Sequence, residues 1–90
     1  MPYVVYIIRF LDNSLYIGQT NNLDERLKEH LDKNTKSSKF SKDHGNFKLV
    51  YQEKYGSRLE SMRREKQLKG WTRAKKEALI SKDKELLRVL

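Results

Sequence analysis

The fold of this chain is decided by residues 3–18, which read YVVYIIRFLDNSLYIG. Apolar and aromatic side chains fill both alternating sets of positions in residues 3–10, a pattern that predicts a β-strand buried on both faces. Polar turn residues follow at positions 12–14, and the apolar pattern resumes at Leu15. We therefore expect residues 3–19 to form a β-hairpin.

A helix is expected after the hairpin. Asn22 and Glu25 have the three-residue spacing of a capping box, with asparagine in place of serine or threonine. The apolar stripe of this helix recurs every four residues, at Leu23, Leu27 and Leu31. Residues 33–46 are rich in lysine, serine, asparagine and aspartate, which predicts an exposed loop.

The second half of the chain predicts one strand and two helices. Alternation of side chains favours a third strand over residues 47–53. Ser57 is expected to cap a second helix that ends at Gly70, and Thr72 is expected to cap a third. The apolar positions of these two helices are Leu59, Met62 and Leu68, followed by Ala74, Ala78 and Leu79. The order ββαβαα indicates an α+β fold, a three-stranded antiparallel β-sheet flanked by three helices.

Length and composition restrict the class of protein. Ninety residues form a single domain, 1–90, and a domain of this size buries roughly two-thirds of its unfolded surface. The absence of cysteine excludes disulfides and thiolate metal sites. No apolar run approaches the roughly 20 residues that span a bilayer, and the amino terminus lacks the charged start of a signal peptide. We therefore expect a cytoplasmic protein with no membrane partner.

The charge of the chain favours a polyanionic partner. Its 20 basic and 12 acidic residues give a net charge of +8, which attracts nucleic acid through the release of counterions. By itself this surplus also fits a solvated lysine-rich surface. Two segments concentrate it, residues 33–42 with four lysines and no acid, and residues 58–76 with eight basic and two acidic side chains. We expect these segments to contact the phosphate backbone without reading bases, through Lys36, Lys39, Lys42, Arg63, Arg64, Lys66, Lys69 and Arg73.

Glu65 is the most informative single carboxylate. It lies three residues after Met62 and three before Leu68, on or beside the expected apolar stripe of the second helix. A carboxylate there costs free energy unless it is paired or binds a cation. One interpretation is a salt bridge to Arg26 or to a neighbouring lysine. The other is a ligand for Mg²⁺, which keeps several waters in its shell. The rival carboxylate, Glu60, is expected to be solvated.

Arg26 and His30 are four residues apart and are expected on one face of the first helix. The planar guanidinium of arginine matches phosphate geometry, and its charge can stabilise the transition state of phosphate chemistry. Each residue also has a structural interpretation. Arg26 can be solvated or paired with Glu29 or Asp24, and a histidine in this position is more often structural than catalytic.

Tyr6 and Tyr16 are expected to lie close together across the hairpin. Strand tyrosines are usually packing residues, and a tyrosine acts as a general base only if its pKa falls from about 10. Taken singly, none of these residues is diagnostic. Taken together, ten residues separate Tyr6 from Tyr16 and ten more separate Tyr16 from Arg26. Tyrosine, arginine, histidine and glutamate together can activate a water, bind a phosphate and hold one divalent metal, so this set of residue types points to phosphodiester cleavage rather than to binding alone.

At these residues the chain resembles the GIY-YIG nuclease family, which is named for two short strand motifs. Residues 16–18, Tyr-Ile-Gly, match the second motif completely. Tyr6 matches the tyrosine of the first motif, and valines at positions 4 and 5 stand where the family name has Gly-Ile. Residues 65–73 and 75–80 resemble the corresponding run of the small stand-alone bacterial members, which are close to a bare catalytic domain.

The resemblance implies a role for each candidate residue. Arg26 falls at the position of the catalytic arginine, and His30 at a position that family members fill with histidine or tyrosine. Glu65 aligns with the single metal-binding glutamate. The implied activity is that of a divalent-metal-dependent endonuclease working by a one-metal mechanism. Glu65 would hold Mg²⁺ or Mn²⁺, Arg26 would neutralise the scissile phosphate, and Tyr6 would be the general base with Tyr16 sharing that role. His30 would orient a tyrosine or contact the phosphate.

The expected partner is nucleic acid, DNA rather than RNA, and a protein partner could deliver the substrate. The alternative function is a non-catalytic or partner-dependent nucleic-acid-binding module on the same scaffold, because a fold does not guarantee an activity. A third interpretation, a basic protein that binds any polyanion, leaves the spacing of the five candidate residues unexplained.

Overall fold

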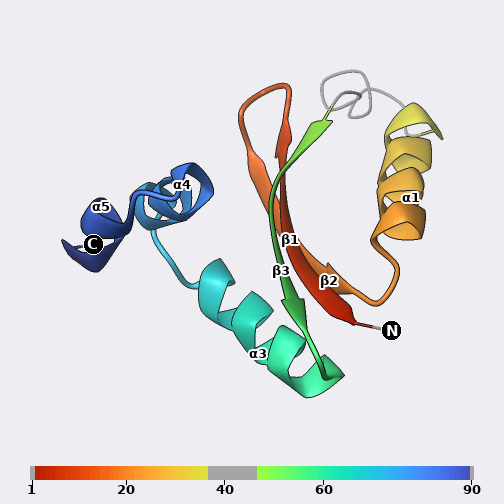
Figure 1. Cartoon of the computed structure of the whole chain (residues 1–90). Helices are drawn as coiled ribbons and strands as arrows, with labels where there is room; N and C mark the ends of the chain where they lie inside the picture. The colour runs from red at the N-terminus through yellow and green to blue at the C-terminus, as the bar shows by residue number, and fades with distance from the viewer. Residues whose placement is uncertain (1, 37–46, 90) are drawn as a thin grey trace.

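The computed structural model describes residues 2–36 and 47–89, and for residues 30–36, 84, 86 and 89 it describes the backbone alone. One antiparallel sheet has the strand order β2-β1-β3, formed by β1 (Tyr3–Phe10), β2 (Leu15–Thr20) and β3 (Phe47–Tyr55). Helix α1 (Leu23–Lys36) covers one face, and the other side carries α3 (Arg58–Lys69), α4 (Arg73–Ser81) and α5 (Lys84–Val89) (Figure 1). The predicted α+β fold and its order ββαβαα are confirmed, and the short helix α5 follows without a prediction from sequence. Among the described residues, no helix is both long and apolar enough to cross a membrane.

Strand β1 is the centre of the sheet and is buried on both faces, as its apolar run predicts. Val5, Ile7 and Ile8 are fully buried, and burying a side chain of this kind stabilises a fold by about 1.5–3 kcal/mol. On one side β1 pairs with β2, in a register that sets Tyr6 opposite Gly18. On the other side it pairs with β3, with a bulge between Ile7 and Ile8. The predicted hairpin is confirmed.

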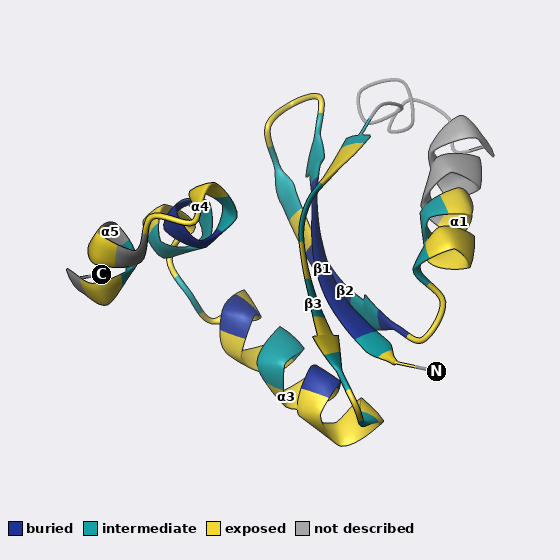
Figure 2. Cartoon of the chain, viewed as in Figure 1, coloured by how far each residue is buried: buried dark blue, intermediate teal, exposed yellow. Residues whose placement is uncertain are grey.

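Two apolar cores form, one on each face of the sheet (Figure 2). The core under α1 consists of Val4, Tyr6 and Ile8, with Leu23 and Leu27 of the helix packed against it. The core on the opposite face joins β1 and β2 to the C-terminal helices through Val5, Ile7, Ile17, Leu68 and Leu79. Tyr6 therefore faces α1, so this helix supplies part of its surroundings.

Side-chain caps set the predicted helix boundaries. The Asn22 carboxamide oxygen accepts a hydrogen bond from the Glu25 amide at 3.2 Å, and its nitrogen donates to the Glu25 carboxylate at 3.1 Å. The Asn22 cap is therefore confirmed. The reciprocal main-chain bond of a capping box is replaced, because the Asn22 amide donates to the Thr20 hydroxyl at 3.1 Å. Ser57 and Thr72 accept hydrogen bonds in the same way at the starts of α3 and α4, and Gly70 ends α3. Replacing a cap of this kind by alanine typically costs about 1 kcal/mol.

The first helix is longer than predicted. α1 runs to Lys36, whereas the loop was expected to begin at residue 33, and that boundary is wrong. No glycine or proline interrupts residues 32–36, so the helix continues after its apolar stripe has ended. The remainder of the predicted loop, residues 37–46, lies outside the described part of the chain.

The apolar stripe predicted for α3 is wrong in two of its three positions. Leu59 and Met62 are exposed, with 57% and 43% of their surface accessible, whereas Leu68 is fully buried. The face that packs against the sheet instead includes Ser61, which is also fully buried. A small side chain at that point lets the helix approach β2 closely. On α4 the predicted core position Ala74 is likewise exposed, because the contact face of each helix is selected by packing and not by hydrophobicity alone.

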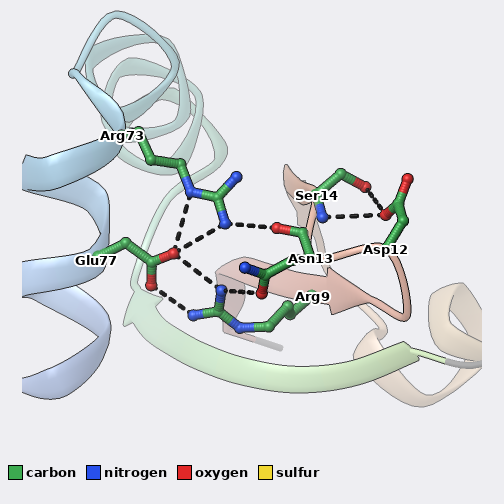
Figure 3. A network of polar contacts seen from close by, with 6 residues as sticks. All are labelled: Arg9, Asp12, Asn13, Ser14, Arg73 and Glu77. Atoms are coloured by element: carbon green, nitrogen blue, oxygen red, sulfur yellow. Dashed lines mark hydrogen bonds and ion pairs between the residues drawn. The ribbon is translucent and has the colours of Figure 1, made fainter.

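A polar network joins α4 to the turn between β1 and β2 (Figure 3). Arg9 in β1 donates two hydrogen bonds to the Glu77 carboxylate, and Arg73 donates a third at 3.0 Å. Arg9 and Arg73 also donate to the side-chain and main-chain oxygens of Asn13. The hydrogen bonds from Arg9 and then Arg73 lower the pKa of Glu77 to about 2. The network therefore fixes α4 against the hairpin.

Candidate active site at the edge of the sheet

Gly18 makes room for the Tyr6 side chain on strand β2. The two residues face each other in the hairpin, and a Cβ atom added at Gly18 would lie 2.6 Å from the Tyr6 hydroxyl oxygen. The missing side chain therefore lets the phenol ring lie across β2, which is the edge strand. Tyr16 places its ring centre 6.3 Å from that of Tyr6. The expectation that the hairpin brings the two tyrosines together is confirmed.

The two tyrosines differ in exposure and therefore in chemistry. Tyr6 has 1% of its surface exposed and Tyr16 has 40%. Burial raises the pKa of Tyr6 above its ordinary value, Tyr16 and Glu65 raise it further, and Arg26 lowers it. At neutral pH Tyr6 is thus a neutral phenol. A general base needs a lowered tyrosine pKa, so the raised pKa of Tyr6 is opposite in direction.

The charges of Arg26 and Glu65 both influence the pKa of the Tyr6 hydroxyl group. Arg26 comes from α1 on one side of the sheet, and Glu65 comes from α3 on the other (Figure 1). Strand β2 is one of the two edge strands in the order β2-β1-β3, so side chains from both faces of the sheet can approach it. Of the five predicted catalytic residues, Tyr6 and Tyr16 have adjacent rings, and Arg26 and Glu65 contribute charges that act on the pKa of Tyr6.

Arg26 lies in the first turn of α1 and forms an exposed ion pair. Its guanidinium is 3.6 Å from the Glu29 carboxylate, one of the two partners expected for it, and the two side chains are 44% and 56% exposed. Pairs with this exposure contribute only about 0–1 kcal/mol, so a phosphate can compete with Glu29 for the guanidinium. A hollow of about 130 Å³ adjoins it, lined by Arg26 with Thr20, Asn21, Asn22, Glu25 and Glu29.

Glu65 lies on the side of α3 that faces the sheet, one turn after the buried Ser61. Its side chain is 22% exposed and pairs with Lys69 at 3.3 Å, which confirms the expected pairing with a neighbouring lysine. Within the described residues, no group of three or more His, Cys, Asp or Glu side chains could hold a metal ion. A divalent cation at Glu65 would have one protein carboxylate and would keep most of its waters. That donor set fits Mg²⁺.

His30, the fifth predicted catalytic residue, lies in α1 one turn after Arg26. Its backbone is described and its side chain is not, so its predicted role stays a prediction. The same holds for Lys36 at the end of α1. Lys39 and Lys42 lie outside the described residues.

The predicted phosphate-binding residues of the C-terminal helices divide into two groups. Arg63, Lys66 and Lys69 are exposed on α3. Arg64 is instead held by Glu53 of β3, to which it donates at 2.9 and 3.0 Å, and it lies 5.1 Å from the centre of the Trp71 ring. Arg73 belongs to the Glu77 network. The two arginines therefore stabilise the packing of their helices.

Two features of this edge had no signal in the sequence. A buried serine on a charged helix matches no periodic pattern, yet Ser61 contacts Gln19 of β2. The closeness of Gly18 to the Tyr6 hydroxyl depends on the register of the hairpin. Both features become visible only when the strands are paired.

Comparison with known proteins gives concordant matches. Residues 2–78 match the model of the GIY-YIG catalytic domain. A UPF0213 protein from Staphylococcus haemolyticus is 41% identical over 76 residues, which cover 84% of this chain and 90% of that protein. A UPF0213 protein from Clostridium perfringens is 43% identical over 77 residues, covering 86% and 81%. The names of these relatives state no activity.

A solved structure has the same arrangement. It is the solution NMR structure of a UPF0213 protein from Bacillus halodurans, which shares 38% sequence identity with this chain and superimposes with a TM-score of 0.59. The match covers 90% of this chain and 84% of that protein. The fold and the family match therefore agree.

Proposed function

The chain belongs to the GIY-YIG family of nucleases, and on that premise we propose that it is a divalent-metal-dependent endonuclease that hydrolyses phosphodiester bonds, those of DNA in preference to RNA. One observation carries the proposal. Gly18 leaves room for the buried Tyr6 ring beside Tyr16, and the charges of Arg26 and Glu65, on helices at opposite sides of the sheet, both influence the pKa of Tyr6. A cation-binding carboxylate, a guanidinium and two phenols at one edge form a set suited to phosphodiester chemistry.

Glu65 would hold the metal ion. Its one described ion-pair partner, Lys69, has a side chain that is 56% exposed and can leave without disturbing the core. A bound Mg²⁺ or Mn²⁺ supplies positive charge that polarises the scissile phosphate and steadies the leaving oxygen. Because Glu65 lies at the sheet-facing side of α3, the substrate would be held at the β2 edge.

The other residues would act directly on the substrate and the attacking water. Arg26 exchanges its exposed contact with Glu29 for the phosphate and neutralises the charge that grows in the transition state. Tyr6 and Tyr16 would position the attacking water. Only a phenolate can take the proton of that water, so Tyr6, whose pKa is raised by burial, must first lose its own proton, a change that the charge of Arg26 favours. His30 orients a tyrosine or contacts the phosphate.

The basic residues outside this set would position the nucleic acid. Arg63, Lys66 and Lys69 are exposed on the helix that carries Glu65, so they can contact phosphates on either side of the cleaved bond. The lysines at 36, 39 and 42 would extend this surface from the end of α1. Such contacts carry no sequence information, so we expect cleavage without strong base preference.

The experiment that tests the proposal is cleavage of a panel of labelled substrates: plasmid, linear duplex, single-stranded and branched DNA, and RNA. Each is incubated with Mg²⁺, with Mn²⁺ and with chelator, for wild type and Glu65→Gln. We expect metal-dependent cleavage that Glu65→Gln abolishes, with thermal unfolding and substrate binding retained. Glu60→Gln is the matched control, because Glu60 is exposed on the same helix. Unchanged cleavage by Glu65→Gln would contradict the metal assignment.

A second candidate function is a nucleic-acid-binding module with no turnover. The raised pKa of the buried Tyr6 and the pairing of Glu65 with Lys69 favour it. Binding by a basic surface should persist in chelator and weaken as salt rises, whereas cleavage should vanish in chelator. Tight binding with no cleavage of any substrate would favour this function, or an enzyme that needs a protein partner to deliver its substrate.

A further inference from the structure

A second polar hollow lies beside the candidate active site. Its volume is about 200 Å³, and it is lined by Tyr3, Gln19, Asn21 and Arg58. These residues come from β1, from the end of β2 and just beyond it, and from the first turn of α3, so only the folded chain assembles them. None of the four has a role in the proposed reaction.

The lining of the hollow offers hydrogen-bond donors, one positive charge and no acid. A phenol hydroxyl, two carboxamides and a guanidinium can all donate. No described acidic side chain pairs with Arg58, whereas Arg9, Arg64 and Arg73 are each bound by a glutamate. The hollows that contain Arg26 or Arg64 each include a glutamate. An acid-free set of donors around a planar guanidinium is suited to a phosphate group.

A buried serine lies beside one of these donors. The Ser61 hydroxyl is fully buried and lies 3.2 Å from the side-chain oxygen of Gln19 and 2.8 Å from the main-chain carbonyl of Arg58. The single hydrogen of the Ser61 hydroxyl goes to the nearer Arg58 carbonyl or to Gln19. In either orientation of the Gln19 carboxamide, its NH₂ group keeps at least one hydrogen that can donate to a ligand. The serine also ties the end of β2 to the first turn of α3, two sides of the hollow.

The hollow adjoins the candidate active site. Gln19 directly follows Gly18, across which the Tyr6 ring lies. Asn21 lines both this hollow and the one that contains Arg26. Since a strand advances about 3.4 Å per residue, the two hollows are close enough to meet one short stretch of nucleic-acid backbone.

We propose that this hollow binds a backbone phosphate of the substrate that neighbours the phosphate to be cut. The inference rests on the proposed nuclease function and adds a substrate-positioning site to it. Arg58 supplies the charge, and Gln19 and Asn21 fix the phosphate by hydrogen bonds. The contact sets the position of the scissile bond relative to Arg26 and Glu65, and it depends on the negative charge of that one neighbouring phosphate.

Single methylphosphonate substitutions test this inference. Each oligonucleotide carries one neutral linkage at a defined distance from the cleaved bond, and kcat/KM is measured for wild type and for Arg58→Ala. For wild type we expect one linkage near the cleaved bond at which neutralisation lowers kcat/KM about 10-fold, the effect of losing a charged hydrogen bond. Arg58→Ala should lower kcat/KM on the unmodified substrate by a similar factor and lose its sensitivity to neutralisation at that linkage. The isosteric Gln19→Glu, which places a carboxylate in the hollow, should weaken binding further.

Arg88→Ala on α5 is the matched control, since it removes the same charge from an exposed arginine outside both hollows. This variant should show the same dependence of kcat/KM on the position of the neutral linkage as wild type. If wild type cleaves and Arg58→Ala shows the same sensitivity at every linkage as wild type, the inference is overturned and the proposed function stands. If wild type does not cleave, the proposed function fails. The binding affinity of the same oligonucleotides for wild type and Arg58→Ala then tests the hollow separately. Thermal unfolding of each variant shows that the fold is intact.

Discussion

Glu65 and Glu77 both lie on basic helices on the same side of the sheet, but their carboxylates have different partners. Glu77 accepts hydrogen bonds from Arg9 and Arg73, which fix it against the hairpin (Figure 3). Glu65 contacts one described lysine, Lys69, at 3.3 Å. An arginine pair satisfies a carboxylate from two directions, whereas a single exposed lysine leaves acceptor positions available. The partners, rather than the carboxylate itself, therefore distinguish a structural glutamate from one that can receive a cation.

Arg9 in the α4 network and Arg26 near the β2 edge differ in the same way, in how firmly each is bound by a carboxylate. Arg9 is 25% exposed and bound to Glu77 by two hydrogen bonds, while Arg26 is 44% exposed and lies 3.6 Å from Glu29. Binding a substrate costs little at Arg26, because the contact that is lost is weak. At Arg9 it would break a network that holds α4. The arginine of the α4 network is thus held in structural hydrogen bonds, whereas the arginine near the β2 edge remains available to a ligand.

After the complete loss of cleavage expected for Glu65→Gln, the largest expected effect is that of Arg26→Ala. Losing one charged contact to the transition state typically lowers the rate by about 10²–10³-fold, so kcat should fall by that factor while the melting temperature changes little. Arg9→Ala, at the other region, should instead lower the melting temperature and leave kcat of the folded protein close to wild type. Steady-state kinetics and thermal unfolding of the pair measure both effects. A loss confined to affinity would make Arg26 a binding residue.

Gly18→Ala tests whether cleavage depends on the position of the Tyr6 ring across strand β2. The new methyl group would lie 2.6 Å from the Tyr6 hydroxyl oxygen, so the ring must move. A displacement of about 1 Å in an active site can cost about 10²-fold in rate, and we expect a loss of that size. Gly56→Ala is the control, because a Cβ there has no atom within 4 Å. Equal activity of the two variants would show that the ring position does not matter for cleavage.

Glu77→Gln should have the smallest effect and should act on stability. The side chains of the network are 25–49% exposed, so solvent screening limits the loss to about 1 kcal/mol at pH 7. A loss of that size corresponds to about 4–8 °C in melting temperature for a domain of this size. Cleavage by the folded variant should be retained, in contrast to Glu65→Gln.

The lowered pKa of Glu77 also predicts how the stability of the protein depends on pH. Folding lowers the pKa of Glu77 to about 2, so the unfolded chain binds more protons between that value and the ordinary carboxyl range. The contribution of Glu77 is complete above the ordinary pKa and is lost as pH falls towards 2. Urea unfolding between pH 7 and pH 2 should therefore show a shallower acid dependence for Glu77→Gln than for wild type. Identical profiles would contradict the role of the network.

Much of the fold could be predicted because local patterns agree with it. The apolar run of residues 3–10 can only be satisfied by burial on two faces, and β1 is the central strand. Asn22, Ser57 and Thr72 cap their helices as their spacing indicates. The closeness of Tyr6 and Tyr16 follows from the hairpin.

The rest could not be predicted, because it depends on contacts between elements distant in sequence. Met62 was expected to be buried and is exposed, while Ser61 beside it is buried, since the sheet accepts only a small side chain there. Arg64 resembles any other basic residue of α3 until Glu53 of β3 lies opposite it. Short helix α5 has no sequence signal strong enough to separate it from α4.

The sequence by itself determined the order of the elements, the sites of the helix caps and which residues are candidates for chemistry, because these depend on side-chain type and on spacing along the chain. The tertiary structure alone decided which charged side chains form structural ion pairs and which lie near the edge of β2. It also decided that Tyr6 is buried with a raised pKa, and that Gln19 and Arg58 line one hollow. Solvation and the fields of neighbouring charges act through space, so they are defined only when strands and helices from different parts of the chain have packed together.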